Sequence, residues 1–474
     1  MASPTNPPQP FYALINYEDP YVQPLILSAL SALLPPDSYT LITSLSDYPT
    51  TTSPPLLHFL PYESLDWTLA LSNPTTHLLN AYVIRKALIR KHYLSTTVAN
   101  WLVKHPTSVL RGHVKTGVEL EVDYVEFLDE ALVEAWEVWE SWGRNAQRGE
   151  EGRREWEWWV LKPGMSDRGQ GIRLFCDEEG LRGIFEGWEE EEEEEDDEDE
   201  DTTSNPDEAR EGPPTDADSE EPKTKGDGII TSQLRHFILQ PYIHPPLLFP
   251  PSSSTSAPPP QNTKFHIRTY ILAVGALRVY VYKPMLALFA AEPYSAPWEG
   301  EVNEKLGAHL TNTCLQDGER EGVVRGFWEL PEDIHLQSSN SADQNPESDS
   351  APASVVTMED WKENVFTQIT STTAEVFEAA ARAMSIHFQL LPNAFELFGL
   401  DFLVDASGRA WLLEVNAFPD FKQTGDDLKE IVGGLFEEVV RVGVAPFFGF
   451  GGEGGGTEGT ERMVRVLDID LGRR

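Results

Sequence analysis

Residues 398–416 have the sequence FGLDFLVDASGRAWLLEVN, which predicts two β-strands joined by a turn at Ser407-Gly408. Folded as an antiparallel hairpin with its loop at 406–409, this segment places Asp401 opposite Glu414. Side chains alternate along a strand, so Asp401, Glu414 and Asn416 share one face. The other face is apolar and is expected to pack against a core; it consists of Phe402, Val404, Trp411, Leu413 and Val415.

The two opposed acids of this hairpin suggest a bound cation. Like charges directly opposite each other on neighbouring strands destabilise a sheet, and a cation between them removes that cost. Two carboxylates and an amide oxygen are hard ligands that suit Mg²⁺, which also binds phosphate oxygens. We therefore expect a magnesium–nucleotide site at Asp401, Glu414 and Asn416. The alternative is an edge hairpin whose acids are simply solvated.

Length, charge and cysteine content limit the class of protein. The 474 residues suffice for two or three domains. A net charge of −42 disfavours binding to nucleic acid or to anionic membranes. Two cysteines far apart in the chain indicate a reducing compartment. The first residues lack a signal-peptide pattern, and no apolar run reaches the roughly 20 residues of a membrane helix. We expect a cytoplasmic protein.

The order of segments predicts several domains. A small α/β domain is expected over residues 1–77, followed by a central lobe at 78–244. A Pro/Ser linker at 245–263 leads to a C-terminal lobe at 264–448, and residues 449–474 form a Gly-rich tail.

Two insertions within these lobes are expected to be disordered, at 189–227 and 338–355. The first contains 21 Asp or Glu and only 3 Lys or Arg, so it repels itself. A helix is expected to end before it, at Trp188. Other helices are expected from Asn80, as a cap, to His92, and from Val122 to Trp142.

A basic segment stands out in this acidic chain. Between Trp67 and Val118 there is no Asp or Glu, whereas seven basic residues occur. This pattern fits either a solvated helix face or a docking patch for an acidic partner or a substrate phosphate. The seven residues are Arg85, Lys86, Arg90, Lys91, Lys104, Arg111 and Lys115.

Residues 158–174, WWVLKPGMSDRGQGIRL, suggest a phosphate-binding loop. A strand ends at Lys162, and Gly169 and Gly171 lead into a further strand. Glycines allow backbone N–H groups to approach phosphates closely, and a lysine supplies a point charge. The pattern is neither a Walker A loop nor a Rossmann fingerprint. Alternatively it is an ordinary turn.

Two further strands carry polar residues in suggestive positions. In residues 237–243, FILQPYI, a polar residue precedes an aromatic one, a pattern that suits a strand lying under a bound adenine ring. The alternative is a plain buried strand. In residues 264–271, KFHIRTYI, the residues Lys264, His266, Arg268 and Tyr270 share one face. Two cations and a histidine on one face indicate phosphate or carboxylate binding, unless the strand is a solvated edge.

The order of these motifs resembles that of an ATP-grasp enzyme, and more narrowly the tubulin–tyrosine ligase family. The resemblance extends from about residue 80 to 442, apart from the insertions. Further matching segments are AEPY at 291–294, HLTN at 309–312 and FELFG at 395–399. The resemblance implies an ATP-grasp fold of α+β and α/β type, in which two antiparallel-sheet lobes enclose ATP.

The resemblance also implies roles for individual residues. Lys162 is expected to hold phosphates beneath the loop of Gly169 and Gly171, and Arg268 to contact the terminal phosphate and the acyl phosphate. Asp401, Glu414 and Asn416 would hold Mg²⁺. The adenine pocket would be lined by Gln240, Tyr242 and Ile243 with Lys264 beside it, and Asn312 joins Lys162 and Arg268 as a candidate catalytic residue.

The implied activity is the ATP-dependent joining of a free amino acid to a carboxylate of a protein. An acidic substrate, such as the tubulin C-terminal tail, would dock on Arg85, Lys86, Arg90 and Lys91. The alternative is an ATP-binding scaffold without acceptor chemistry. Leu288 motivates it, because the family usually has an acceptor-binding arginine there. A small-molecule ATP-grasp ligase is disfavoured by the family-specific motifs.

Overall fold

The computed structural model separates into two compact units. Unit 1 comprises Met1–Thr116, Ile243–Ser295 and Gly307–Arg474, and unit 2 comprises Gly117–Tyr242 and Ala296–Leu306. The predicted domain boundaries remain predictions; in the structure, residues 78–116 pack within unit 1. The described residues are 8–49, 51–164, 169–201, 234–251, 261–311, 323–332, 334–336, 356–357, 360–425, 428–451 and 459–471.

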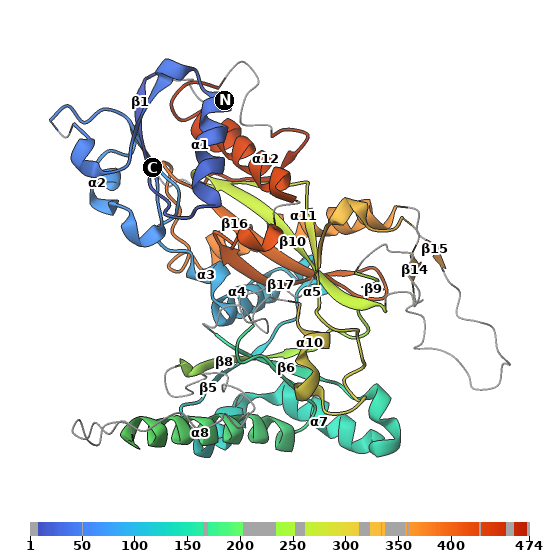
Figure 1. Ribbon diagram of the computed structural model, residues 1–474. Coiled ribbons are helices and arrows are strands. Elements are labelled where there is room, and N and C mark those ends of the chain that lie inside the picture. Colours follow the sequence, from blue (N-terminus) through green and yellow to red (C-terminus); the bar gives the residue numbers. More distant parts are fainter. Residues whose placement is uncertain are drawn as a thin grey trace, which may run out of the picture. The chain divides into compact units, whose positions relative to one another are not determined.

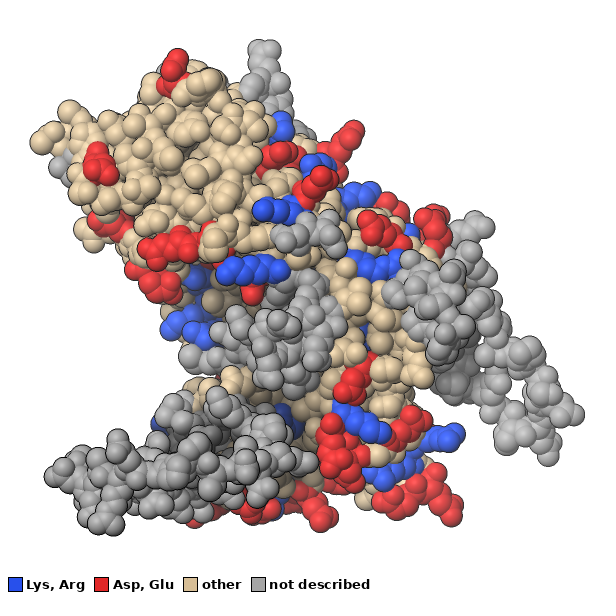
Figure 2. Space-filling view, viewed as in Figure 1, with Lys and Arg blue, Asp and Glu red and all other residues tan. Residues whose placement is uncertain are grey.

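Unit 1 begins with the small α/β arrangement that the sequence predicts. Its four strands are parallel and lie in the order β2-β1-β3-β4. Figure 2 shows few charged side chains on the visible surface of this N-terminal part. The elements are β1 (Phe11–Ile15), α1 (Val22–Leu33), β2 (Tyr39–Ile42), β3 (Leu56–Phe59), α2 (Trp67–Ser72) and β4 (His77–Leu79).

The main sheet of unit 1 is built around one long strand, β10 (Thr263–Val274). One edge of β10 pairs with β16, and the other pairs first with β12 and then with β11. β17 extends the sheet beyond β16, and β18 extends it beyond β11. The strands are β9 (Leu248–Phe249), β11 (Arg278–Tyr282), β12 (Leu286–Phe289), β13 (Val324–Gly326), β16 (Phe395–Val404), β17 (Ala410–Ala417) and β18 (Met463–Asp468).

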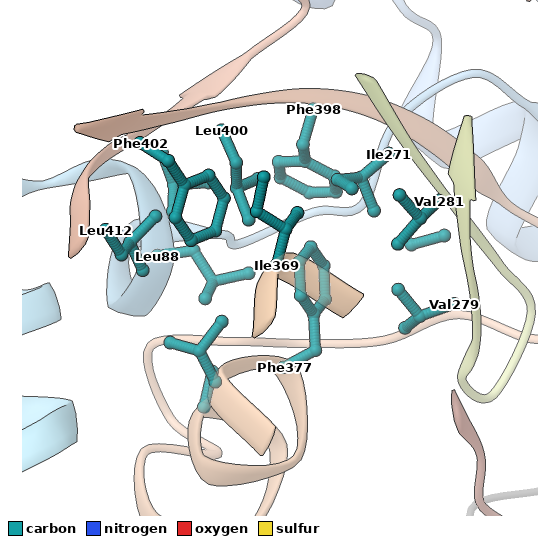
Figure 3. Packing of buried hydrophobic residues seen from close by; sticks show 14 of the residues in the cluster. Leu88, Ile271, Val279, Val281, Ile369, Phe377, Phe398, Leu400, Phe402 and Leu412 are labelled. Carbon is teal, nitrogen blue, oxygen red and sulfur yellow. The ribbon is translucent and has the colours of Figure 1, made fainter. Parts of the chain in front are cut away.

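Helix α11 (Trp361–Ala383) covers one face of this sheet. Its sequence contains no Gly or Pro, and its apolar residues recur at helical spacing. Figure 3 shows Ile369 and Phe377 of α11 beside the sheet residues Ile271, Phe398 and Leu400. Near the other end of the sheet, α12 (Lys429–Val439) covers the opposite face and lies beside α1 (Figure 1). The rest of that face is left for polar side chains.

Unit 2 contains a four-stranded antiparallel sheet in the order β5-β8-β6-β7. Its strands are β5 (Val118–Glu121), β6 (Trp159–Pro163), β7 (Arg173–Phe175) and β8 (His236–Pro241). Trp159, Leu161, Phe237 and Leu239 form a core with helices α7 (Trp136–Arg148) and α8 (Glu178–Asp201). Because strand side chains alternate, the intervening residues face away from this core.

Three helix predictions were wrong in their bounds. The Asn80 side chain bonds both the N–H and the C=O of Leu60, at 3.1 and 2.8 Å, and so does not cap a helix. The helices here are α3 (Lys86–Ile89) and α4 (Lys91–Lys104). Short helical turns replace the first part of the predicted 122–142 helix, and α8 runs on to Asp201 because glutamate favours helix. The rest of insertion 189–227, and 338–355, lie outside the described residues.

None of the helices in the described ranges is long and apolar enough to cross a membrane. The remaining elements are short. These elements are η1 (Pro36–Ser38), η2 (Leu45–Asp47), η3 (Tyr62–Ser64), α5 (Leu110–His113), η4 (Val125–Phe127), α6 (Leu128–Ala131), η5 (Leu132–Glu134), η6 (Glu150–Glu155), η7 (Val302–Lys305), α10 (Leu306–His309), η9 (Phe327–Glu329), β14 (His335–Leu336), β15 (Val356–Thr357), η10 (Lys422–Thr424) and the π-helical turn η12 (Val440–Val444).

Candidate functional site

The β16–β17 hairpin places Asp401 directly opposite Glu414, as the sequence predicts. The loop, however, spans 405–409, and Val404 rather than Asp405 pairs with Ala410. The Asp405 carboxylate is used within the loop, where it accepts hydrogen bonds from the backbone N–H groups of Ser407 (2.9 Å) and Arg409 (3.1 Å).

A β-bulge between Asp401 and Phe402 restores the predicted pairing of the two acids. The bulge changes which residues face the core. Leu412, not Trp411 or Leu413, joins Phe402, Val404 and Val415 in the cluster beneath α11. Trp411 instead packs with Leu403 and Ile243 on the other face, next to the polar residues, and Leu413 packs partly against them. The predicted core face was therefore wrong at Trp411 and Leu413.

Three charged residues form a row across neighbouring strands. Arg268 on β10 is opposite Asp401 on β16, which is opposite Glu414 on β17. The guanidinium contacts both carboxylate oxygens of Asp401, with Nε–Oδ1 at 2.5 Å and Nη2–Oδ2 at 3.0 Å. Arg268 and Asp401 are buried, whereas Glu414 is partly exposed. The sheet thus aligns one cation and two carboxylates.

Asn416 completes the predicted cluster. Its amide nitrogen lies 3.4 Å from Asp401 Oδ2 and 3.2 Å from Glu414 Oε1, so all three predicted magnesium ligands converge. Among the described residues, no group of three or more His, Cys, Asp or Glu could hold a metal ion. A metal here would therefore need Asn416. The donor set fits Mg²⁺, because an amide turned by 180° presents oxygen, and a carboxylate paired with arginine keeps free lone pairs.

Gly399 makes room for this cluster, a role that sequence reasoning missed. It lies between Tyr270 and Asn416 in the strand register. A Cβ at this position would be 2.8 Å from Pro419 Cβ and 3.2 Å from Arg268 Cδ. A side chain there would push directly on the arginine that holds Asp401.

We predict that Gly399→Ala lowers the free energy of unfolding by about 1–3 kcal/mol, as overpacking does. Urea denaturation would measure this effect. Gly433→Ala is the matched control, because its Cβ would meet only Leu25 Cδ2, at 3.8 Å. An equal change in the free energy of unfolding in the two variants would contradict the prediction.

Lys91 belongs to this site, although the sequence grouped it with a docking patch. Its Nζ is 3.7 Å from Glu414 Oε2. Lys91 is the first residue of α4, and Arg90 is its N-cap. Cations are unfavourable at a helix N-terminus, which agrees with the functional interpretation of this basic segment as a patch for a phosphate or an acidic group.

Arg85 is also occupied within unit 1. Its Nε lies 2.8 Å from Oε1 of the buried Glu396, and its guanidinium stacks 3.7 Å from the centre of the Tyr62 ring. Of the four predicted docking residues, Arg85 and Lys91 thus contact carboxylates of the β16–β17 hairpin. Lys86 is exposed, and Arg90 is partly exposed.

The face around Arg268 combines a fixed positive charge with neutral imidazoles. Burial lowers the pKa of His266, whose Nδ1 is 2.6 Å from Thr311 Oγ1 and whose Nε2 is 3.7 Å from Asp401 Oδ1. Burial and the nearby Lys264 lower the pKa of His309 to about 3. Burial opposes the charge on Arg268, but Asp401 raises its pKa overall. Burial therefore disfavours the charged form of both imidazoles.

The polar face of the unit 2 sheet carries the second group of predicted residues. Lys162 Nζ donates to Gln240 Oε1 at 2.8 Å, on the side opposite the α7–α8 core. Gly169 and Gly171 have φ of 80° and 71°, a region that favours glycine. The N–H of Tyr242 donates to Trp158 O at 2.8 Å. The structure thus joins Lys162 to Gln240 within unit 2, whereas Ile243 and Lys264 belong to unit 1 and Asn312 lies outside the described residues.

Leu288 occupies an apolar position in unit 1. It is buried, pairs with His266 across β10 and β12, and belongs to the same cluster as Tyr270. Lys283 does not replace the family arginine there, because its Nζ bonds Glu363 of α11 at 2.9 Å. No cation therefore stands at the Leu288 position among the described residues.

The chain has an ATP-grasp fold, and the lysine, arginine and carboxylates on the polar faces of its antiparallel sheets agree with that class. The solved structure of the C-terminal domain from K. lactis Pby1 shares this fold with a TM-score of 0.62 and 32% identity, covering 98% of this chain and 100% of that one. That protein is described as an ATP-grasp enzyme interacting with the mRNA decapping enzyme Dcp2. The chain belongs to the tubulin–tyrosine ligase family, whose model matches residues 113–449.

Two curated fungal relatives agree with this assignment. A "probable tubulin–tyrosine ligase" of Schizosaccharomyces pombe is 38% identical over 444 residues, covering 92% of this chain and 91% of the relative. "Probable tubulin–tyrosine ligase PBY1" of Saccharomyces cerevisiae is 37% identical over 419 residues, covering 87% of this chain and 49% of the relative. The chain thus spans about half of the second relative. The resemblance inferred from the motifs is confirmed, and membership of an ATP-grasp ligase family implies use of ATP.

Proposed function

We propose that this protein uses ATP and Mg²⁺ to form an amide bond between a free amino acid and a carboxylate of a protein. The observation that carries the proposal is the convergence of Arg268, Asp401, Glu414 and Asn416 on one face of unit 1. Carboxylates and an amide that can hold a cation, next to an arginine, are the arrangement expected for binding phosphate. The family of the chain supports the same assignment.

Each predicted residue has a proposed role. Lys162 holds phosphates together with the loop of Gly169 and Gly171. We also include Lys91 in the site, because it contacts Glu414. Mg²⁺ would be held by Asp401, Glu414 and Asn416 and would neutralise charge on the phosphate oxygens. Gln240, Tyr242 and Ile243 would contact adenine, with Lys264 beside them, and Asn312 would act with Lys162 and Arg268 in catalysis.

The proposed reaction has two steps. An oxygen of the substrate carboxylate attacks the γ-phosphorus of ATP, the bond to the bridging oxygen breaks, and ADP leaves. The neutral amine of the free amino acid then attacks the acyl carbon; a C–N bond forms, the C–O bond to the phosphate breaks, and the proton lost from nitrogen goes to the departing inorganic phosphate. Arg268 stabilises the charge on the transferred phosphoryl group, because its guanidinium is already positioned and held positive by Asp401.

A second candidate function is an ATP-binding scaffold without acceptor chemistry. Leu288 favours it, because the position at which the family usually holds the acceptor carboxylate is apolar and buried here. The two candidates agree on ATP binding and differ only in turnover.

We predict that Glu414→Gln lowers amino-acid incorporation at least about 100-fold while ATP binding persists, because one proposed ligand of the charge-neutralising Mg²⁺ is lost. The assay combines the full chain with tubulin, [γ-³²P]ATP and each labelled amino acid in turn. Glu430→Gln, on the exposed surface of α12, is the control that should keep wild-type activity.

The outcomes separate the two candidates. Incorporation that depends on Glu414 supports the ligase. ATP binding with no Glu414-dependent incorporation of any amino acid would exclude ligase activity with tubulin as the acceptor and favour the scaffold. An acidic tail is the proposed docking partner, now through Lys86 and Arg90, since Arg85 and Lys91 are engaged within unit 1.

A further inference from the structure

An aromatic–acidic surface lies on unit 2, apart from the residues assigned to ATP. We define it as the exposed residues between positions 124 and 139. Every exposed Phe, Tyr or Trp side chain in the described part of the chain belongs to it. Its large apolar members, with their exposed fractions, are Tyr124 (50%), Phe127 (46%), Val133 (62%), Trp136 (70%) and Trp139 (40%).

The core of unit 2 does not need these side chains. The same segment already contributes Leu128, Leu132, Ala135 and Val138 to the core, so the aromatic–acidic surface is additional apolar area that faces outward. Trp136 and Trp139 are one turn apart on α7 and therefore lie on neighbouring positions. The indole N–H of Trp139 donates to Leu132 O at 2.9 Å, which fixes this ring. Large exposed aromatic groups in a fixed position are typical of docking sites.

The charged residues of this segment itself have a single sign. Residues 118–143 contain nine Asp or Glu and no Lys, Arg or His. Some of these acids are paired: Asp129 with Arg182, Asp123 with Arg235 and Glu140 with Arg144. Four exposed ones form no ion pair among the described residues; they are Glu126, Glu130, Glu134 and Glu137.

We propose that the aromatic–acidic surface docks a basic amphipathic segment of another protein, with Lys or Arg interspersed among aliphatic residues. The aliphatic side chains would cover Trp136 and Trp139, and the cations would contact both the acids and the indole faces. Nucleic acid and anionic membranes are excluded by the charge. A second copy would oppose acids with acids, and the insertion 189–227, with 21 acids and 3 bases, would be repelled as well.

A designed peptide tests this proposal directly. A fluorescent Leu–Lys peptide of about 18 residues, patterned as an amphipathic helix, is titrated with the full chain by anisotropy, beside its Leu–Glu counterpart. The Leu–Lys peptide is expected to bind and the Leu–Glu peptide is not. Trp136→Ser/Trp139→Ser should weaken binding at least about tenfold, because buried aromatics dominate such interfaces.

Matched variants separate specific docking from general attraction to an acidic protein. Ile386→Ser removes an isolated apolar side chain that is 74% exposed and should leave binding unchanged. Glu130→Gln/Glu134→Gln/Glu137→Gln should weaken binding and flatten its salt dependence. Glu150→Gln/Glu151→Gln/Glu155→Gln, an equal charge change at other exposed positions of unit 2, should not. Circular dichroism confirms that each variant is folded.

Several results would overturn the proposal. If each surface variant weakened peptide binding no more than its matched control, or if the two peptides bound equally well, no specific surface would exist. Loss of peptide binding on deletion of 189–227 would assign the binding to the insertion. A dimer in light scattering that Trp136→Ser/Trp139→Ser dissociates would assign the surface to a second copy of the chain.

Discussion

Arg268→Met is expected to lower the free energy of unfolding by about 3–5 kcal/mol, because it leaves the carboxylate of Asp401 buried without its partner. Asp401 and Arg268 are 3% and 6% exposed, and two hydrogen bonds join them. Removal of one member of such a pair costs far more than the pair contributes as a whole. ATP turnover should also be lost, since Arg268 is the proposed phosphate contact.

A double-mutant cycle isolates this interaction. Asp401→Leu alone should also destabilise, because it leaves the guanidinium buried, whereas Arg268→Met/Asp401→Leu should cost less than the sum of the single changes. Urea denaturation gives the free energies, and hydrogen exchange of the β10 and β16 amides shows whether the loss is local.

An exposed ion pair of the same unit serves as the control. Lys283 and Glu363 are 38% and 56% exposed, so Lys283→Met should cost no more than about 1 kcal/mol. Additive single changes, or an Arg268→Met effect as small as that of Lys283→Met, would contradict the view that Arg268 and Asp401 form a strongly coupled buried pair.

The polar face of the β16–β17 hairpin could be predicted because its information is local. Alternation along two strands is enough to place Asp401, Glu414 and Asn416 on one face. The end of the hairpin was predicted less well, because Asp405 forms hydrogen bonds within its own loop and so shifts the pairing there. The bulge compensates for that shift, and no periodicity reveals a bulge in advance.

The residues that were missed depend on contacts between distant parts of the chain. Lys91 contacts Glu414, more than 300 residues away, and the need for glycine at 399 arises from Arg268 on another strand. Arg85 looks like a free surface cation in the sequence, because nothing near it in the chain is acidic; its partner, Glu396, follows hundreds of residues later. Composition and spacing describe neighbours along the chain, whereas these roles follow from tertiary packing.

Glu396 is expected to make the protein less stable as the pH rises from about 4.5 to 7. Its carboxyl group is buried, 2.8 Å from Arg85 Nε and 3.0 Å from the backbone N–H of Tyr82. Burial raises its pKa from 4.5 to about 7 in spite of the Arg85 charge. The folded protein therefore keeps a proton in this range that the unfolded chain releases, and unfolding becomes easier as the pH rises. Above about pH 7 the effect is complete, at about 3 kcal/mol.

Comparison with Glu396→Gln isolates this effect. The free energy of unfolding of the wild type minus that of Glu396→Gln should fall by up to about 1.4 kcal/mol per pH unit between about pH 5 and 7 and then level off. Urea denaturation at constant ionic strength measures it. The free energy of unfolding of the wild type minus that of Glu430→Gln, which replaces an exposed acid, should change little with pH. A difference that is constant or rises with pH would show that Glu396 is ionised throughout.

Arg85→Met provides an independent test of the same contact. The Arg85 charge lowers the pKa of Glu396, so its removal should raise that pKa further and extend the loss of stability to higher pH. If Arg85 served instead to dock an acidic substrate, the substitution would weaken substrate binding and leave the pH dependence of unfolding unchanged. A shifted pH profile with unchanged substrate binding would therefore assign Arg85 to Glu396 and leave docking to Lys86 and Arg90.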